Sequence, residues 1–460
     1  MNHTCGLILA AGDGKRMRSK SSKVLCQVLF QPMLRWVLDN CAGAGVGELC
    51  VVVGKGAEDV RGILPEEIAT VEQRERLGTG HAVRCAADFI RAHLGEDLLV
   101  LFGDAPFLFP EVIEKAYRQH KEQGNAMTVV SAVVDDPFGY GRIIRGNNGV
   151  EAIVEERDAD DAQRQVREIN AGACWYQCGP LLEALEELTP ANAQGELYLT
   201  DTLAILRGKG YRTDACDAGD ARVVLGANSR RQLAQLNDIA REMVFDRLYD
   251  QGVDIPVTDG VIISPQAVIG RDTTILPGTV IKGNCVIGEN CVIGPNSMLE
   301  DAKVGDGSVV KATWITRSVL EDHVQIGPFS QVRPDCHIGA GAKIGDFVEL
   351  KNSVLGKDVH ASHLTYIGDT DCGSRVNFGC GVVTVNYNGT GKNRTVIGDD
   401  CFIGCNTNLV APVKLGDGAY TAAGSTVTVD LPENSLCIAR ARETVKEQRG
   451  LYSRKKPEGK

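Results

Sequence analysis

In three runs of the second half of the chain an aliphatic residue recurs at every sixth position. This period constrains the fold more than any other feature. A period of six fits neither a helix nor an alternating strand. It is the signature of a parallel β-helix, in which short strands turn corners and stack coil upon coil. The positions are Ile263, Ile269, Ile275, Ile281, Ile287, Ile293 and Leu299, then Ile326, Val332, Ile338, Ile344 and Leu350, and then Ile397, Ile403, Leu409 and Leu415.

Stacking between coils is sufficient to explain such a ladder, so function is expected where the ladder breaks. Between Val385 and Thr395 the aliphatic residues vanish, the chain reads VNYNGTGKNRT, and Asn388-Gly389 is a turn signal. We expect this segment to project from the coils as a loop, a common position for functional residues. Tight corners are predicted at glycines that follow the aliphatic positions: Gly270, Gly288, Gly294, Gly327 and Gly345.

The first half follows a different rule, in which apolar strand-like segments alternate with helix-like ones. GLILAAG, ELCVVVG and DLLVLFGD are the strand-like segments, and helices are expected around PMLRWVLDNCAGAG and HAVRCAADFIRAHLG. This βαβαβ order predicts a Rossmann-like α/β domain with a parallel sheet covered on both faces. Ligands of such sheets bind at the carboxyl ends of the strands, where Gly12 and Asp104 fall.

A helix is predicted to join the two halves. Asn228 or Ser229 can cap it, and apolar residues then recur at three- and four-residue steps. The expected organisation is an α/β domain over residues 1–228, a helical linker over 229–250 and a β-helix over 251–460.

Composition narrows the classes of function. With 460 residues and a net charge of −11, the chain is long enough for two or three domains and too acidic to attract nucleic acid non-specifically. It has no apolar run that could span a bilayer and no basic segment before its first apolar run, so a cytoplasmic protein without membrane insertion is expected. Its 16 cysteines form no C-x-x-C zinc or redox motif, and we expect free thiols.

The loop LAAGDGKRM, directly after an apolar strand, is the first candidate for chemistry. Its small residues let backbone N–H groups approach phosphates, although Met17 at the sixth place departs from G-x-G-x-x-G. Five basic residues lie from Lys15 to Lys23 with no acid among them, which is also the pattern of a solvated loop. Asp104, at a strand end beside this loop, is placed to hold Mg²⁺ or to cap a turn.

Further motifs follow in order: Lys23 in KVL, then RLGTGHA, FGD, GYGRI, IVEERDA, EINAG, NAQGELYLTD and GANSR. Together they resemble the sugar-nucleotide pyrophosphorylases, and most of all the bifunctional UDP-N-acetylglucosamine pyrophosphorylase/glucosamine-1-phosphate N-acetyltransferases of bacteria. The resemblance extends from about residue 5 to residue 445. It implies a left-handed β-helix with three hexads per coil and a homotrimer whose sites are shared between chains.

For the first domain, the resemblance implies transfer of a uridylyl group from UTP to N-acetylglucosamine 1-phosphate. Arg16 and Lys23 would neutralise the UTP phosphates, and Asp104 and Asn228 would bind Mg²⁺. The nucleotide would be lined by Leu9, Ala10, Ala11, Gly12, Gln73, Gly78, Thr79, Phe102 and Gly103, and the sugar by Gly141, Glu155 and Asn170. Taken alone, Gln73 and Asn170 could simply satisfy backbone groups, and Glu155 lies in a run of acids typical of a solvated surface.

For the β-helix, the resemblance implies acetyl transfer from acetyl-CoA to glucosamine 1-phosphate. An amine that attacks a thioester must lose a proton, and histidine is the natural base. His363, in SHLTYIGD, matches the family's base, and Glu349 would orient it. The sugar phosphate would be held by Arg333, Lys351, Tyr366 and Asn377, and acetyl-CoA by Cys380, Asn386, Tyr387, Cys405, Ala423 and Arg440.

Purely structural roles stay open for several of these residues. A histidine of the β-helix chosen at random is more often structural than catalytic, and Arg333 and Lys351 could be ordinary exposed charges. The chain also departs from the family's usual residues, with Phe102 for Tyr, Lys15 for Thr, Cys380 for Ala and Cys405 for Ser.

The function expected is synthesis of UDP-N-acetylglucosamine for the cell wall, by acetylation and then uridylyl transfer. One alternative is a nucleotidyltransferase of single activity whose β-helix only regulates or oligomerises; the joint presence of His363, Asn386-Tyr387 and Arg440 opposes it. The other is a non-catalytic scaffold, which should have lost Lys23 or Asp104.

Overall fold

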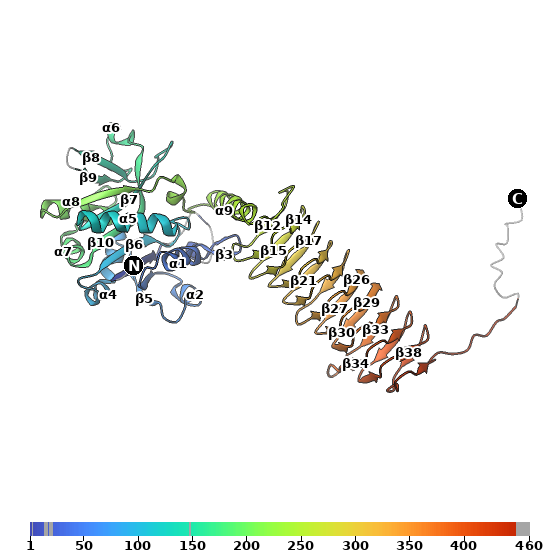
Figure 1. Cartoon of the computed structure of the whole chain (residues 1–460). Coiled ribbons are helices and arrows are strands. Elements are labelled where there is room, and N and C mark those ends of the chain that lie inside the picture. Colours follow the sequence, from blue (N-terminus) through green and yellow to red (C-terminus); the bar gives the residue numbers. More distant parts are fainter. Residues whose placement is uncertain (2, 13–16, 18–21, 147–148, 448–460) are drawn as a thin grey trace, which may run out of the picture. The chain divides into compact units, whose positions relative to one another are not determined.

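The computed structural model describes residues 1, 3–12, 17, 22–146 and 149–447 (Figure 1). The chain divides into two compact units, Met1–Ala240 and Arg241–Lys460. Helix α9, Arg230–Asp250, includes the last residues of the first unit and the first residues of the second. Within the described ranges, no helix is both long and apolar enough to cross a membrane.

A mixed sheet of nine strands forms the centre of the first unit. Its order is β11-β7-β10-β6-β1-β4-β5, with the hairpin β8–β9 attached to β10. The strands are β1 Thr4–Ala10, β4 Glu48–Val53, β5 Ala69–Glu72, β6 Asp97–Phe102, β7 Met127–Val133, β8 Arg142–Gly146, β9 Gly149–Val154, β10 Glu168–Gln177 and β11 Thr213–Asp217; β2 Gln27–Val28 and β3 Gln31–Pro32 form a separate pair.

The parallel pairing predicted from the sequence holds for β1, β4, β5 and β6, but β10 runs antiparallel to both β6 and β7. The sheet is therefore mixed rather than parallel throughout, because β10 runs in the opposite direction. This strand follows the β8–β9 hairpin and the one-turn helix α6, Asp161–Arg164, whereas a parallel strand needs a longer crossover.

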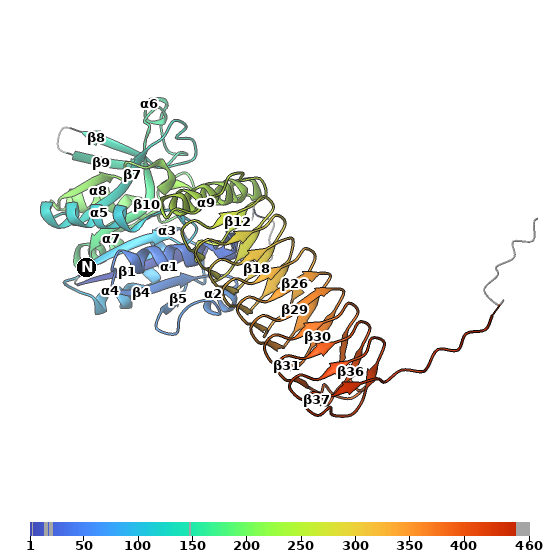
Figure 2. The same cartoon turned by 45° about the vertical axis from the view of Figure 1, so that its right-hand side comes forward.

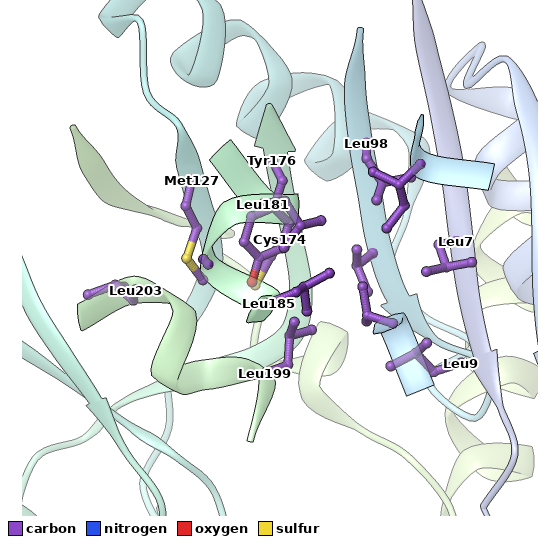
Figure 3. Close-up of a cluster of buried hydrophobic side chains, with 14 of the residues drawn as sticks. Leu7, Leu9, Leu98, Met127, Cys174, Tyr176, Leu181, Leu185, Leu199 and Leu203 are labelled. Atoms are coloured by element: carbon purple, nitrogen blue, oxygen red, sulfur yellow. The ribbon is translucent and has the colours of Figure 1, made fainter. Parts of the chain in front are cut away.

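Residues of a strand point alternately to the two sides of the sheet, so each apolar strand presents an apolar face on both sides. Helices cover both faces. Leu7 and Leu9 of β1 pack with α3 Thr79–Cys85, α4 Ala87–Ala92, α7 Cys178–Glu187 and α8 Thr202–Gly208. Figure 3 shows part of this core, with Leu7, Leu9 and Leu98 on the strands and Leu181, Leu185 and Leu203 on the helices. Ile8 and Ala10 point to the other face, which α1 Met33–Gly43 and α5 Pro110–Gln123 cover.

The helix expected over HAVRCAADFIRAHLG is in fact two, since α3 ends at Cys85 and α4 begins at Ala87. The remaining short helix, α2, spans Ala57–Arg61.

The second unit is the predicted left-handed parallel β-helix, whose stacked coils are visible in Figure 2. Each coil adds one strand to each of three parallel sheets. The first sheet contains β12 Ile262–Ile263, β15 Val280–Lys282, β18 Met298–Glu300, β21 Trp314–Thr316, β24 Gln331–Val332, β27 Glu349–Lys351, β30 Tyr366–Gly368, β33 Val383–Val385, β36 Asn408–Val410 and β39 Thr426–Val427.

The second sheet contains β13 Val268–Ile269, β16 Val286–Ile287, β19 Lys303–Val304, β22 Val319–Leu320, β25 His337–Ile338, β28 Val354–Leu355, β31 Thr370–Cys372, β34 Thr395–Ile397 and β37 Val413–Leu415. The third contains β14 Thr274–Ile275, β17 Val292–Ile293, β20 Val309–Val310, β23 Gln325–Ile326, β26 Lys343–Asp346, β29 His360–His363, β32 Asn377–Phe378, β35 Phe402–Ile403, β38 Tyr420–Thr421 and β40 Leu436–Cys437.

Every aliphatic residue of the predicted ladder is buried inside the β-helix. The ladder also continues where the six-residue count slips, because Val304, Val310, Ile315 and Leu320 stack on Ile287, Ile293, Leu299 and Val304. Spatial stacking, rather than strict sequence spacing, therefore keeps the core continuous.

The corner glycines serve two different purposes. Gly294 and Gly327 adopt positive φ angles, as a tight corner requires. Gly270 does not, but a Cβ there would lie 2.6 Å from the carbonyl carbon of Gly288, so the next coil leaves no room for a side chain. The predicted loop is confirmed, since the chain leaves the coils between β33 and β34 and folds back on itself at Tyr387 and Lys392.

We predict that Leu320→Ala lowers the free energy of unfolding of the second unit by about 2–5 kcal/mol, because it leaves a cavity between two coils. The control is Lys303→Ala, an exposed position on the neighbouring strand β19, which should change stability by less than about 0.5 kcal/mol. Denaturant unfolding of the full chain measures both values, and equal losses would contradict the ladder as the source of stability.

Candidate active sites

Two cavities lie at the carboxyl ends of the strands of the first unit, where ligands of α/β sheets bind. The larger, about 570 Å³, is lined by these predicted residues: Lys23, Thr79, Phe102, Asp104, Gly141, Glu155, Asn170 and Asn228. The smaller, about 260 Å³, is lined by Leu9, Ala11, Gly12, Gln73 and Gly78, and shares Lys23, Thr79, Phe102 and Asp104 with the larger. The nucleotide and sugar residues expected from the sequence thus line two adjoining spaces.

Lys23 lies where the two cavities meet. Its ammonium group forms an ion pair with Asp104 and donates to Asn228 Oδ1 at 3.0 Å. A Cβ on Gly12 would lie 3.5 Å from Lys23 Cε, so the glycine loop, the cation and the carboxylate are neighbours. A strand end, a short 3-10 turn and the approach to α9 supply these groups from distant parts of the sequence.

The wall of the smaller cavity is built on backbone contacts that require glycine. Gly78 has φ +112°, and a Cβ there would lie 2.4 Å from Leu197 O. Gln73 is buried, and its Nε2 donates to Gly78 O at 3.1 Å. Thr79 Oγ1 accepts from Leu199 N–H at 3.0 Å. These side chains are fixed before any ligand enters.

The wall of the larger cavity places a buried carboxyl group beside glycine and amide groups. Burial raises the pKa of Glu155, while a hydrogen bond from Thr200 Oγ1 at 3.1 Å opposes this shift. Gly141 packs against that carboxylate, and its carbonyl accepts from Asn170 N–H at 2.9 Å. Glu155 is thus a pocket residue and not part of a solvated acidic surface.

Some predicted residues lie apart from this arrangement. The Ala10 side chain points into the core on the α1 and α5 face, because neighbouring residues of β1 face opposite ways. Gly103 packs near Ile8 and Leu34 and lines neither cavity. Arg16, expected on the UTP phosphates, lies outside the described residues, as does Lys15.

Sequence reasoning gave no role to several residues of the NAQGELYLTD motif that line the larger cavity: Gln194, Glu196, Tyr198, Leu199 and Thr200. The motif itself was the signal that could have identified these residues. It contributed to the resemblance, but its individual side chains were given no roles. Tyr140 and Phe138, in and beside GYGRI, line the same cavity and were also missed.

In the β-helix, His363 lies at a corner, and 60% of its side chain is exposed. Its Nδ1 lies 2.8 Å from Asp346 Oδ1, and His363 lowers the pKa of Asp346. Because a carboxylate only accepts, Nδ1 carries the proton of the neutral ring and Nε2 keeps a free lone pair. Within one chain Glu349 pairs with Arg333 at 3.0 Å, and the acid that contacts His363 is Asp346, one coil before it.

A polar network around Asp369 gathers several of the predicted sugar-phosphate and acetyl-CoA residues. Lys351 Nζ lies 4.0 Å from Asp369, and Asn386 donates to Asp369 and, at 3.3 Å, to Tyr366 Oη. Lys351 also lies against Lys392 and lowers the pKa of that ammonium group, so two cations stand side by side. Sequence reasoning missed both Asp369 and Lys392, the latter within the projecting loop.

The other predicted acetyl-CoA residues follow the corner of His363 along the coils. Asn406 N–H donates to Cys380 O at 2.8 Å, and Gly424 N–H donates to Cys405 O at 2.7 Å. Ala423 follows on the next coil, and Arg440 Cδ lies 3.9 Å from the Cβ position of Gly424. Tyr387 is exposed on the projecting loop, whereas Asn377 lies on β32, in a different sheet from Lys351 and Tyr366.

None of the 16 cysteines forms a disulfide. Cys405 is the exposed one, and Cys380 is half-buried. The exposed thiol thus lies on the same corner as His363.

An α/β domain with cavities at its strand ends and a hexapeptide β-helix on one chain are the two parts of a bifunctional transferase. Two family descriptions match accordingly: "MobA-like NTP transferase domain" over residues 6–193, and "Bacterial transferase hexapeptide (six repeats)" over 266–301, 284–313, 317–352 and 394–428.

Similar proteins span nearly the whole chain. "Bifunctional protein GlmU" of Acetivibrio thermocellus is 44% identical over 96% of both chains, and that of Clostridium perfringens is 45% identical over 95% of this chain and 96% of the other. The protein of the same name from Halalkalibacterium halodurans is 44% identical over 97% of this chain and 98% of the other. A solved structure titled as a putative glucose-1-phosphate thymidylyltransferase from Bacillus anthracis shows 21% identity and a TM-score of 0.44, covering 52% of this chain and 96% of that one.

The chain belongs to the bifunctional GlmU family, which confirms the resemblance of its motifs. It is therefore an N-acetylglucosamine-1-phosphate uridylyltransferase and a glucosamine-1-phosphate N-acetyltransferase that makes UDP-N-acetylglucosamine. The alternatives of a single-activity enzyme and of a scaffold do not fit this family.

We predict that Asp346→Asn lowers kcat for acetyl transfer roughly tenfold to hundredfold with little change in KM, because the amide no longer fixes the His363 tautomer. Release of CoA thiol measures the rate across pH. The matched control is Glu321→Gln, which disrupts another carboxylate–histidine pair of the β-helix, Glu321 and His337 at 2.8 Å, and should leave the rate unchanged. Equal effects of the two substitutions would show that Asp346 is merely structural.

Proposed function

We propose that UTP binds along the smaller cavity and N-acetylglucosamine 1-phosphate in the larger one. The proposed domains are the uridylyltransferase domain over residues 1–228, the helical linker over 229–250 and the acetyltransferase domain over 251–460. The observation that supports this is the position of Lys23, which borders both cavities and lies between Asp104 and the glycine loop. Gln73, Gly78 and Thr79 hold the base, and Gly141, Glu155 and Asn170 hold the sugar. Arg16 is proposed on the phosphates from the resemblance alone.

Mg²⁺ belongs to this proposal as a cofactor held by Asp104 and Asn228. Both side chains offer oxygen atoms, which Mg²⁺ prefers, and both already contact one cation, the Lys23 ammonium group. When bound, the metal would neutralise charge on the triphosphate.

The uridylyl step needs positioning and charge rather than a protein nucleophile. A phosphate oxygen of the sugar phosphate attacks the α-phosphorus of UTP. The bond from that phosphorus to the oxygen bridging to the β-phosphate breaks, and pyrophosphate leaves with the electron pair. Lys23, released from Asp104 by the incoming phosphates, stabilises the negative charge of this transfer.

The acetyl step depends on the exposed imidazole at the corner of the β-helix. His363 Nε2 removes a proton from the amine of glucosamine 1-phosphate as the nitrogen attacks the thioester carbonyl. The C–S bond then breaks, its electron pair leaves with the sulfur, and the proton held by Nε2 passes to this sulfur, so that CoA departs as a thiol and the imidazole returns to its neutral form. Arg333, Lys351, Tyr366 and Asn377 are proposed to bind the sugar phosphate; Cys380, Asn386, Tyr387, Cys405, Ala423 and Arg440 are proposed to bind acetyl-CoA.

A homotrimer and a cytoplasmic location complete the proposal. Asn377 lies on another sheet than Lys351, which supports a site completed by a second copy of the chain. Beside His363, an apolar ridge of Phe329, Phe347 and Leu364 is 64%, 55% and 59% exposed, as an interface in a lone chain would be. Free thiols throughout the chain support a reducing compartment.

We expect the full chain, given glucosamine 1-phosphate, acetyl-CoA, UTP and Mg²⁺, to release both CoA thiol and pyrophosphate. His363→Ala should lower thiol release by at least about 100-fold because the base is lost. Pyrophosphate release from UTP should persist when N-acetylglucosamine 1-phosphate is supplied as the acceptor. Asp104→Ala should lower pyrophosphate release and leave thiol release unchanged. A chelator should likewise stop only pyrophosphate release. Any other pattern contradicts the division of labour between the sites.

Phe347→Glu should dissociate the trimer and lower acetyl transfer, because a charge enters the apolar ridge. Uridylyl transfer should continue. Light scattering gives the molecular mass, and Val133→Glu, an exposed apolar position of the first unit, is the control. A monomeric wild-type chain with full acetyl transfer would refute the shared site.

A further inference from the structure

A cluster of potential metal ligands lies at the edge of the first unit's sheet opposite the two cavities. Cys5 is the second residue of β1, which runs from there towards Leu9 and the glycine loop. His93 and Glu96 belong to the turn before β6, closed by a hydrogen bond from Glu96 N–H to His93 O at 3.0 Å. Within the described part of the chain, one donor atom from each of Cys5, His93 and Glu96 lies within 4.8 Å of the other two.

A second thiol, that of Cys178 at the start of α7, lies beside Cys5 and outside this group of three. Cys178 N–H donates to Glu96 O at 3.2 Å, and its side chain is within hydrogen-bonding reach of the Cys5 thiol. Both cysteines are buried, with 0% and 1% exposure. Glu48, which pairs with Cys5 in the register of β1 and β4, reaches the cluster from the solvent side, since 61% of its side chain is exposed.

The hydrogen bonds of His93 leave its second nitrogen facing an acceptor. Nδ1 lies 2.8 Å from Phe89 O, and because a carbonyl only accepts, Nδ1 carries a proton. In the neutral ring Nε2 is then an acceptor, yet it faces Glu48 Oε2 at 3.5 Å. A positive charge on Nε2, supplied either by a second proton or by a metal ion, would satisfy both atoms. A backbone carbonyl on Nδ1 is also the usual support for a metal-bound histidine.

We propose that Cys5, Cys178, His93 and Glu96 bind one Zn²⁺ ion, with Glu48 at the mouth of the site. Thiolate and imidazole ligands suit Zn²⁺, whereas Mg²⁺ takes oxygen ligands, so the site is distinct from the one at Asp104. Around tetrahedral Zn²⁺ the ligand atoms would draw together to about 3.5 Å from one another. Each thiol that binds releases its proton to solvent.

The proposed ion acts as a structural link rather than in either reaction. It would connect the start of β1, the turn before β6 and the start of α7, which lie far apart in the sequence. A ligand that binds only the folded state stabilises it, so Zn²⁺ should raise the melting temperature of the first unit.

The test uses the full chain, stripped with a chelator and titrated with Co²⁺ as a spectroscopic probe. We expect one equivalent to bind with a thiolate-to-cobalt charge-transfer band, and Zn²⁺ to displace it. Cys5→Ser, Cys178→Ser and His93→Gln should each weaken binding at least about tenfold. The matched control is Cys50→Ala, a buried thiol on the adjacent strand β4, which should bind as the unaltered chain does.

His93→Gln keeps the test decisive if the core variants fold poorly, because this residue lies in a partly exposed turn. Zn²⁺ should raise the melting temperature of the unaltered chain and of Cys50→Ala, but not that of His93→Gln. A charge-transfer band that persists in Cys5→Ser, no binding by the unaltered chain, or a Cys5–Cys178 disulfide in freshly prepared protein would each overturn the proposal.

Discussion

Stacking of one coil on the next decides which side chains of the β-helix can meet. Backbone pairing places Lys343 beside His360 and Glu349 beside Tyr366. The same offset carries Asp346 to His363 and brings Lys351 to the network around Asp369. An outward side chain therefore has its partner on the neighbouring coil, and the polar groups around His363 are brought together by repetition of the backbone rather than by a local motif.

Charge compensation has the corresponding role in the first unit. Lys23 is held by Asp104 and Asn228, groups that lie at a strand end and just before α9. In the proposed function a triphosphate would compete for this cation, which the ion pair keeps ordered between the two cavities. Rigid walls support it, since Gly78 and Gln73 are fixed by the backbone of Leu197 and by each other.

Much of the fold could be predicted from the spacing of apolar residues, because burial of particular positions imposes that spacing on the sequence. The hexads identified the β-helix, and the apolar strands identified the α/β domain. The antiparallel course of β10 was not accessible, since its apolar residues would suit either direction and only the preceding hairpin reverses the chain. Asp346 was missed because its importance arises from a neighbour 17 residues later, a separation without meaning until coils are stacked.

The sequence by itself determined the family, the two activities and the residue types that carry them, because motif order and repeat period are properties of the chain. The tertiary structure decided which acid of the same chain contacts His363, which face of the sheet Ala10 packs against, and how Cys5, His93 and Glu96 come together at one edge of a sheet. The physical reason is that hydrogen bonds and ligand contacts act over a few ångströms in space, and proximity between distant segments is created only when the chain folds.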